Sequence, residues 1–132
     1  MVQENSGNDK PIDSPEKKGY LSLVSRKIVQ MKKGSLELAI LALLSLDECY
    51  GYDLCQQLKQ NGVETVAGTV YPLLNRLKKE GIIDYTWKES VQGPPRKYYV
   101  LTALGRDVFR EMCREWDNLK EGLQNIIAKT EL

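Results

Sequence analysis

The sequence contains no histidine, and this absence removes a large part of enzyme chemistry. A histidine general base is impossible, and with it the commonest ways of activating a serine or cysteine nucleophile. The sequence also lacks a recognisable set of zinc ligands. Its three cysteines, Cys49, Cys55 and Cys113, are odd in number and fit neither a CxxC nor a zinc-finger spacing. We therefore expect no metal, no cofactor and no enzyme. The thiols are interpreted as small buried apolar residues, with redox sensing by one of them left open.

Long apolar runs are also missing. No segment approaches the roughly 20 apolar residues that cross a bilayer. The first residues, MVQENSGNDK, lack the charged-then-apolar pattern of a signal peptide. The 132 residues are 42% hydrophobic and 28% charged, which is typical of one globular domain, and we expect a cytoplasmic protein.

The sequence has almost no excess of charge of either sign, because its formal net charge is only +1. The charged residues are, however, unevenly distributed along the chain. Residues 103–132 are close to neutral. Three other regions are basic: residues 17–33 without any acid (Lys17, Lys18, Arg26, Lys27, Lys32, Lys33), residues 76–79 (Arg76, Lys78, Lys79) and the pair Arg96 and Lys97. This distribution suits a protein that presents one face to phosphates.

Three helices are predicted in the first part of the chain. Residues 33–46 have the pattern of a buried helix with Ser35 as its N-cap, and a break at 47–52 precedes a short helix over 52–60. Residues 68–80 are predicted to form the third helix, and Gly81 ends it as a C-cap. Pro72 is expected near the start of this helix, because a proline deep inside a helix would break it. Its apolar stripe has 3-4 spacing and contains Val70, Leu73, Leu74 and Leu77.

A hairpin and a long helix complete the chain. Residues 82–90 and 97–102 are rich in β-branched and aromatic residues and flank a turn built on Gly-Pro-Pro. Thr102 can cap a helix over 103–129. Two series of apolar residues, each spaced by seven, make a heptad stripe on this helix: Phe109, Trp116 and Leu123, then Met112, Leu119 and Ile126. One helix cannot bury such a stripe alone, so we expect a homodimer.

Three helices followed by a hairpin is the order of a winged helix-turn-helix domain. The predicted class is therefore mainly α with a small β-hairpin, divided into a flexible basic N-terminal tail or arm (1–30), a winged helix-turn-helix domain (31–102) and a C-terminal dimerisation helix (103–132). In this fold the third helix enters the major groove and the hairpin contacts DNA as a wing. The candidate DNA contacts are Thr69, Tyr71, Asn75, Arg76 and Lys79 on the helix, with Arg96 and Lys97 on the wing.

Three stretches of the sequence resemble the PadR family of transcriptional regulators. They are YGYDL (50–54), GTVYPLLNRLKKEGII (68–83) and GPPRKYYVLTALGR (93–106), and the resemblance covers about residues 31–129. It implies a repressor that binds a two-fold-symmetric double-stranded DNA operator. The short C-terminal part is similar to the family's smaller, multidrug-sensing branch, in which the last helix makes the dimer.

The resemblance also implies a small aromatic effector. In the multidrug-sensing members a tryptophan of the last helix stacks on flat ligands at the dimer axis, and Trp116 stands at the matching place. Met112 and Lys120 are the other candidate ligand contacts. Lys120 is a departure, because those members have an acid there, which puts a preference for cationic ligands in doubt.

Several alternatives stay open on the sequence alone. Tyr71 either contacts DNA or packs under the wing, and the heptad stripe is either a plain dimer core or also a ligand site. Residues 17–33 are an arm that clamps DNA, an amphipathic surface for anionic lipid, or a solubilising tail with a helix that packs on the dimer. The fold itself also occurs in protein-interaction modules that bind no specific DNA.

Overall fold

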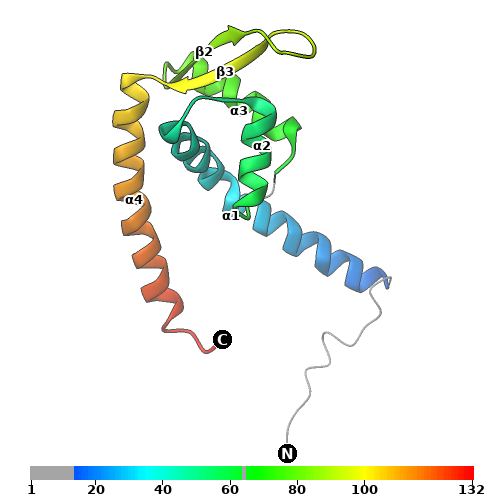
Figure 1. The fold of residues 1–132 in the computed structure, drawn as a ribbon. Helices are drawn as coiled ribbons and strands as arrows, with labels where there is room; N and C mark the ends of the chain where they lie inside the picture. Colours follow the sequence, from blue (N-terminus) through cyan, green and yellow to red (C-terminus); the bar gives the residue numbers. More distant parts are fainter. Residues whose placement is uncertain (1–13, 64) are drawn as a thin grey trace, which may run out of the picture. The chain divides into compact units, whose positions relative to one another are not determined.

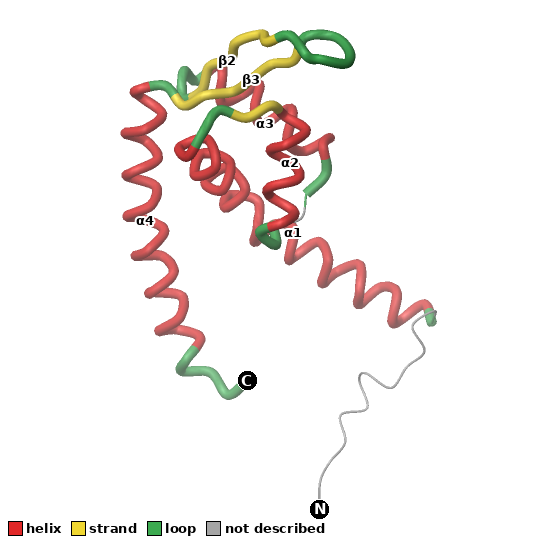
Figure 2. Tube along the Cα trace, in the orientation of Figure 1, coloured by secondary structure: helices red, strands yellow, loops and turns green. Residues whose placement is uncertain are grey.

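The structure is a computed structural model that describes residues 14–63 and 65–132. Its elements are α1 (Pro15–Leu46), β1 (Cys49–Tyr50), α2 (Gly51–Gln60), α3 (Ala67–Lys79), β2 (Ile83–Lys88), β3 (Arg96–Leu101) and α4 (Ala103–Ile127), as Figures 1 and 2 show. The predicted class, a mainly helical winged helix-turn-helix with a hairpin and a long last helix, is confirmed. The chain divides into two compact units, residues 1–34 and residues 35–132.

Three antiparallel strands form a sheet in the order β1-β3-β2. The hairpin pairs Ile83 with Leu101 at one end and Lys88 with Arg96 at the other. The third strand, β1, corrects the prediction that residues 47–52 are only a break. A two-residue strand shows no alternating pattern in sequence, and it exists here because Cys49 and Tyr50 pair with Tyr99 and Tyr98 of β3.

The start of α1 corrects two further predictions. The sequence predicts a flexible tail or arm over residues 1–30 and a helix that Ser35 begins. Instead Ser14 caps α1, because its Oγ accepts a hydrogen bond from the N–H of Lys17 at 3.2 Å. Pro15 in the first helical position and Glu16 in the first turn suit a helix start, so Ser35 lies inside α1. Residues 1–13 of the predicted tail lie outside the described residues.

One apolar core lies within residues 35–132, where α2, α3 and the second part of α1 pack with the sheet. Its members are Leu36, Ile40, Leu41, Leu44, Cys49, Leu54, Leu58, Val70, Leu73, Leu74, Leu77, Ile83, Tyr99 and Leu101. The α3 stripe predicted from the sequence is entirely buried. Pro72, however, is the sixth residue of α3 rather than part of its first turn. The helix continues across it because the carbonyl that loses its donor belongs to Gly68, an exposed residue that water reaches.

Thr102 fixes the junction between β3 and α4. Its Oγ1 accepts a hydrogen bond from the N–H of Gly105 at 2.9 Å, which confirms the predicted N-cap. The same hydroxyl lies 2.7 Å from the carbonyl oxygen of Gly81, to which it donates. The backbone N–H of Thr102 also donates to the carbonyl oxygen of Ile82 at 3.1 Å. One residue therefore ties the start of α4 to the start of the hairpin.

We expect Thr102→Ala to lower the free energy of unfolding by about 1–2 kcal/mol, because it removes both the cap and the donor to Gly81. Thr102→Ser keeps the hydroxyl and is expected to lose much less. Urea unfolding followed by circular dichroism measures both values. Equal losses in the two variants would contradict the role given to the hydroxyl.

Candidate nucleic-acid interface

The two sides of α3 differ in character. Val70, Leu74 and Leu77 are fully buried and hold the helix on the core. The opposite side is exposed and carries Thr69, Tyr71, Asn75, Arg76 and Lys79. The structure thus brings the five predicted helix contacts to one solvent-facing side. A helix that reads a groove of DNA needs this division, because its apolar side fixes it while its polar side meets base edges and phosphates.

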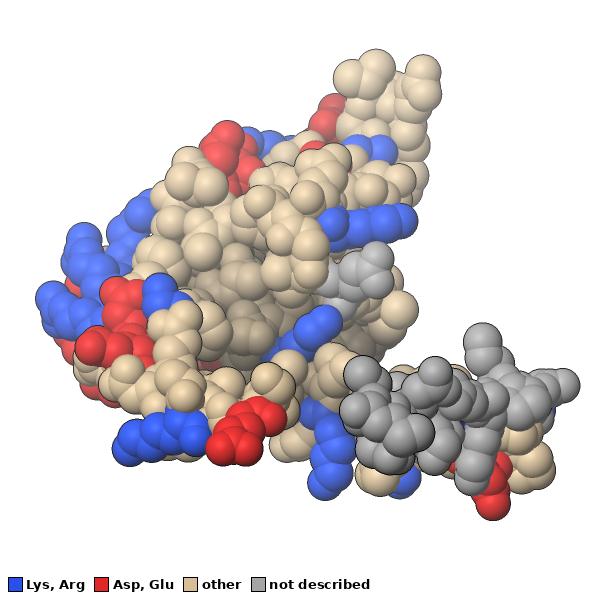
Figure 3. All heavy atoms as spheres, turned by 90° about the horizontal axis from the view of Figure 1, so that it is seen from below, with Lys and Arg blue, Asp and Glu red and all other residues tan. Residues whose placement is uncertain are grey.

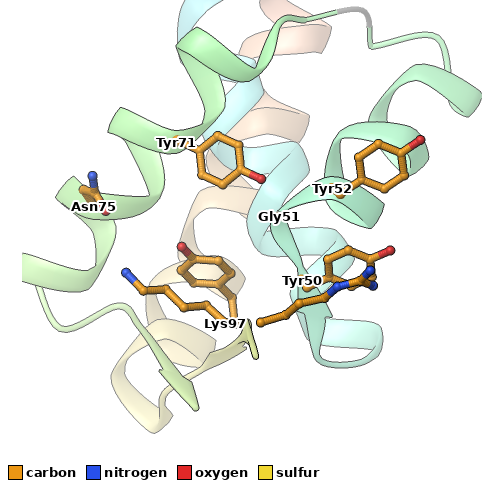
Figure 4. A pocket seen from close by; sticks show the side chains of 8 residues that line it. Tyr50, Gly51, Tyr52, Tyr71, Asn75 and Lys97 are labelled. Atoms are coloured by element: carbon orange, nitrogen blue, oxygen red, sulfur yellow. The ribbon is translucent and has the colours of Figure 1, made fainter. Parts of the chain in front are cut away.

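A hollow of about 650 Å³ lies beside this exposed side. Its walls come from α3, from β1 and the start of α2, and from β3, as Figure 4 shows. The lining residues are Tyr50, Gly51, Tyr52, Tyr71, Asn75, Arg96, Lys97 and Tyr99. Two predicted helix residues, Tyr71 and Asn75, and both predicted wing residues therefore meet in one place.

Gly51, the first residue of α2, allows the close approach of the Tyr71 ring. A Cβ at position 51 would lie 2.6 Å from the Oη of Tyr71, and real Cβ atoms essentially never come so close. In Figure 4 the Tyr71 ring points from α3 toward Gly51. The side chain is 42% exposed, so it both packs on α2 and presents one edge to the hollow. Burial raises the pKa of Tyr71 further above neutral pH, where a tyrosine hydroxyl is already protonated and able to donate.

Aromatic rings hold the two basic residues of the wing. The guanidinium of Arg96 lies 4.6 Å from the centre of the Tyr50 ring, and that ring is in turn 5.5 Å from the ring of Tyr98. The Lys97 ammonium lies 4.4 Å from the centre of the Tyr85 ring. Such stacking limits the rotamers of long side chains while the charges still face solvent. The hollow is therefore bordered by two positive charges that are already positioned.

The bases on α3 are arranged differently. Arg76 donates to the Oε2 of Glu37 at 2.9 Å, and Lys78 lies 3.3 Å from a carboxylate oxygen of Asp84. Within residues 14–63 and 65–132, no ion pair involves Lys79. Since Arg76 and Glu37 are both accessible to solvent, their pair stabilises the fold by less than about 1 kcal/mol. The pair still directs the guanidinium toward α1.

The apolar stripe of α4 is uncovered over most of its length. Phe109 and Met112 are half-buried against the core, whereas Trp116, Leu119, Leu123 and Ile126 are exposed. The polar sides of the helix carry three pairs spaced by three residues: Asp107 with Arg110, Glu111 with Arg114, and Asp117 with Lys120. Figure 3 shows basic and acidic side chains lying next to one another on the face that it displays. The helix is thus nearly neutral, and within residues 35–132 nothing covers its apolar side from Trp116 onward.

Cys49 is buried, in keeping with its interpretation as a core residue, while Cys55 and Cys113 are only half-buried. Burial, with the charges of Asp53 and Asp47, raises the pKa of Cys49 to about 11. Because the thiolate is the reactive form, such a group is a poor redox sensor at neutral pH.

We expect Cys49 to be alkylated by iodoacetamide at pH 8 at least about 100-fold more slowly in the folded protein than in urea, because its thiolate fraction falls from roughly one in ten to one in a thousand. Mass spectrometry of the labelled peptides measures both rates. Cys113, which is half-buried on α4, provides an internal comparison. Similar rates for Cys49 with and without urea would contradict the stated burial.

Four lining residues were missed as site residues by the sequence: Tyr50, Gly51, Tyr52 and Tyr99. The first three are the YGY that begins the stretch 50–54, so the signal was visible only as part of a longer motif. Tyr98 and Tyr99 alternate in direction along β3, since Tyr99 is buried and Tyr98 is not. In the described part of the chain, no group of three or more His, Cys, Asp or Glu side chains is placed to hold a metal ion. Nor does any helix there have the length and apolarity to cross a membrane.

Comparison with known proteins places this architecture among transcription factors. The model of the PadR-like transcriptional regulator family matches residues 40–111. The transcriptional regulator Rv3488 of Mycobacterium tuberculosis is 30% identical over 90 residues, which are 68% of this chain and 83% of that protein. A PadR-like transcription factor from Bacteroides fragilis is 44% identical, with a TM-score of 0.65 over 76% of this chain and 98% of that one. PadR of Bacillus subtilis, solved in complex with operator DNA, is 28% identical, with a TM-score of 0.56 over 60% of this chain and 45% of that one.

Proposed function

Since this chain belongs to the PadR-like family of transcriptional regulators, we propose that it is a repressor that binds double-stranded operator DNA through α3 and the hollow beside it. Such a protein acts in the cytoplasm and catalyses no reaction. The observation that carries the proposal is the meeting of Tyr71, Asn75, Arg96 and Lys97 around one hollow on the exposed side of α3. The operator DNA in the complex of the Bacillus subtilis relative supports it.

The exposed side of α3 is assigned to the major groove. Thr69, Asn75 and Lys79 offer a hydroxyl, an amide and an ammonium, which are groups that bond to base edges and phosphates. Arg76 is 60% exposed, and its ion pair with Glu37 is a weak surface pair that a phosphate can replace. We propose that Arg76 and Lys79 are the phosphate contacts of this helix.

The hollow is assigned to a phosphate of the DNA backbone. Arg96 and Lys97 supply two positive charges at its border, and Tyr71 supplies a hydroxyl. The first N–H groups of α2 add to this, because Tyr50 provides no side-chain cap for them. A helix start with open N–H groups favours anions. Contacts of this kind give affinity rather than choice of sequence.

We expect Tyr50→Leu to weaken DNA binding by about threefold to fivefold, because the ring that holds the Arg96 guanidinium is removed. Tyr50→Phe keeps that ring and is expected to bind as the parent protein does. Fluorescence anisotropy with one labelled duplex measures both variants. A matching loss in Tyr50→Phe would assign the effect to the hydroxyl and contradict the stacking role.

A titration against the DNA upstream of its own gene tests the proposal. The protein is expected to bind that duplex at least 1000-fold more tightly than a random duplex at moderate salt, with an affinity that falls steeply as salt rises. Equal affinity for the upstream duplex and the random duplex at low salt would contradict the proposal. That result would favour a protein-interaction module that binds no specific DNA.

The exposed stripe of α4 supports a homodimer in which Phe109, Met112, Trp116, Leu119, Leu123 and Ile126 pack against a second copy. Burial of such a stripe in a partner removes apolar surface from water, and a two-fold dimer matches a two-fold operator. Sedimentation equilibrium tests this. Leu123→Asp is expected to yield monomers, whereas the adjacent, off-stripe Gln124→Asp keeps the dimer. A dimer that survives Leu123→Asp would contradict this interface.

The effector part of the proposal concerns Trp116, with Met112 and Lys120 beside it. Trp116 is 41% exposed, and the ammonium of Lys120 lies 3.8 Å from a carboxylate oxygen of Asp117. We propose that a flat aromatic molecule stacks on Trp116 at the dimer axis and releases the DNA. In a Trp87→Phe background, such ligands are expected to quench the fluorescence of Trp116. Quenching without any change in DNA affinity would reject the regulatory role.

A further inference from the structure

The first part of α1 is a separate feature with its own charge. Residues 14–34 lie outside the residues 40–111 that match the family, and they belong to a compact unit of their own. They hold six bases (Lys17, Lys18, Arg26, Lys27, Lys32, Lys33) and one acid, Glu16, so the net charge is six minus one, or +5. No other stretch of this length in the chain is so basic.

Apolar side chains form a stripe along this part of the helix. At about 100° per residue, the side chains of Tyr20, Leu21, Val24, Ile28 and Met31 fall within an arc of about 100°. Leu21 and Ile28 are 41% exposed and Met31 is 73% exposed. Lys27 and Lys32 fall on the two borders of the stripe, and Arg26 and Lys33 fall on the opposite side. From Tyr20 to Met31 the helix therefore carries an apolar stripe, with Leu23 and Val29 outside it and Lys17 one turn before it on the same side. The segment is also strongly cationic.

The positive charge and the apolar stripe of residues 14–34 together indicate which kind of partner this helix binds. The phosphates of DNA would meet the bases but would leave the apolar stripe in water. A second copy of this helix would cover the stripe with Leu21, Val24, Ile28 and Met31 as a and d positions. Lys27 and Lys32 would then occupy g and e positions and would repel each other across the pair. A surface that carries negative headgroups above an apolar layer satisfies both features.

We propose that residues 15–34 form an interfacial helix that binds the surface of a membrane containing anionic phospholipid. The helix lies in the plane of the surface with its apolar stripe at the boundary of the acyl chains. The stems of Lys27 and Lys32 extend along the borders of the stripe and place their ammonium groups among the phosphates of the headgroups. Binding by this segment is independent of the DNA-binding face assigned above.

Co-sedimentation of the full-length protein with vesicles tests this proposal. Vesicles of phosphatidylcholine with about 30% phosphatidylglycerol are expected to bind the protein at least tenfold more tightly than vesicles of phosphatidylcholine alone. Ile28→Gln removes an apolar group from the stripe and is expected to weaken that binding about tenfold. The neighbouring Val29→Gln is the matched control, because Val29 is 66% exposed and lies on the basic side. Gln favours helices and carries no charge, so neither variant alters the net charge.

Four results would overturn the proposal. The first is equal binding to neutral and anionic vesicles. The second is an equal loss in Ile28→Gln and Val29→Gln. The third is loss of vesicle binding in an Arg96→Ala, Lys97→Ala double variant, which would place the lipid contact on the DNA-binding face. A shift from dimer to monomer in Ile28→Gln, with vesicle binding intact, would assign the stripe to a second copy and equally reject the proposal.

Discussion

Gly105→Ala is expected to cost about 3 kcal/mol of stability or more, enough to leave little folded protein. A Cβ at this position of α4 would overlap the carbonyl oxygen of Ile82 and lie 3.0 Å from its carbon. That carbonyl accepts the N–H of Thr102, so it cannot retreat without breaking the junction between β3 and α4. Helix propensity alone predicts the opposite sign, because alanine normally stabilises a helix relative to glycine by about 0.5–1 kcal/mol. The overlap with the Ile82 carbonyl outweighs this gain, because backbone overlap in a packed region lowers the free energy of unfolding by more than helix propensity raises it.

Gly122→Ala is the matched control for this prediction. It makes the same substitution in the same helix, but a Cβ at position 122 meets nothing within 4 Å in the single chain. Thermal unfolding followed by circular dichroism is expected to show a higher melting temperature for Gly122→Ala, and a much lower one or no folded protein for Gly105→Ala. Comparable melting temperatures for the two variants would contradict the packing at Ile82.

The second large effect concerns the two charges at the border of the hollow. We expect the double substitution Arg96→Ala, Lys97→Ala to lower operator affinity about 100-fold, since each charged hydrogen bond to a phosphate contributes about a factor of ten. The slope of log affinity against log salt is expected to become shallower by roughly 1.8, or about 0.9 for each phosphate that the variant no longer neutralises. Anisotropy titrations over a series of salt concentrations measure both quantities.

Removal of charge elsewhere separates this local effect from a change in net charge. Arg110→Ala, Arg114→Ala removes two arginines from α4, where they pair with Asp107 and Glu111. This variant is expected to keep operator affinity within about twofold and to keep the slope, because long-range charge effects are screened at physiological salt. Equal losses in the two double variants would show that the hollow contributes no specific contact.

The parts of the fold that follow from local pattern could be predicted from the sequence. The 3-4 spacing of Val70, Leu73, Leu74 and Leu77 marked the buried side of α3, and this also fixed which side is exposed. Thr102 before an apolar heptad helix marked a cap that the structure contains. These signals succeed because they depend on residues within one or two turns of each other.

Features that depend on contacts distant in sequence could not be predicted. Gly51 gave no sign that Tyr71 would pack on it, because the two residues belong to different helices. The pair of Arg76 and Glu37 likewise joins residues 39 positions apart, so the charge run at 76–79 did not reveal which base is already engaged. The start of α1 differs, since the sequence Ser14-Pro15-Glu16 is a readable cap. It was missed because the polar composition around it favoured a tail.

The central claim is that the exposed side of α3 lies against DNA in the bound state, and photo-crosslinking tests it most directly. Asn75 lines the hollow on α3, while Gln124 lies exposed on α4 outside the apolar stripe. Replacement of Asn75 by p-benzoylphenylalanine is expected to give a covalent adduct with the duplex on irradiation, and the same replacement of Gln124 is expected to give none. A DNA adduct from position 124, or none from position 75 while the complex is shown to be formed, would contradict the account.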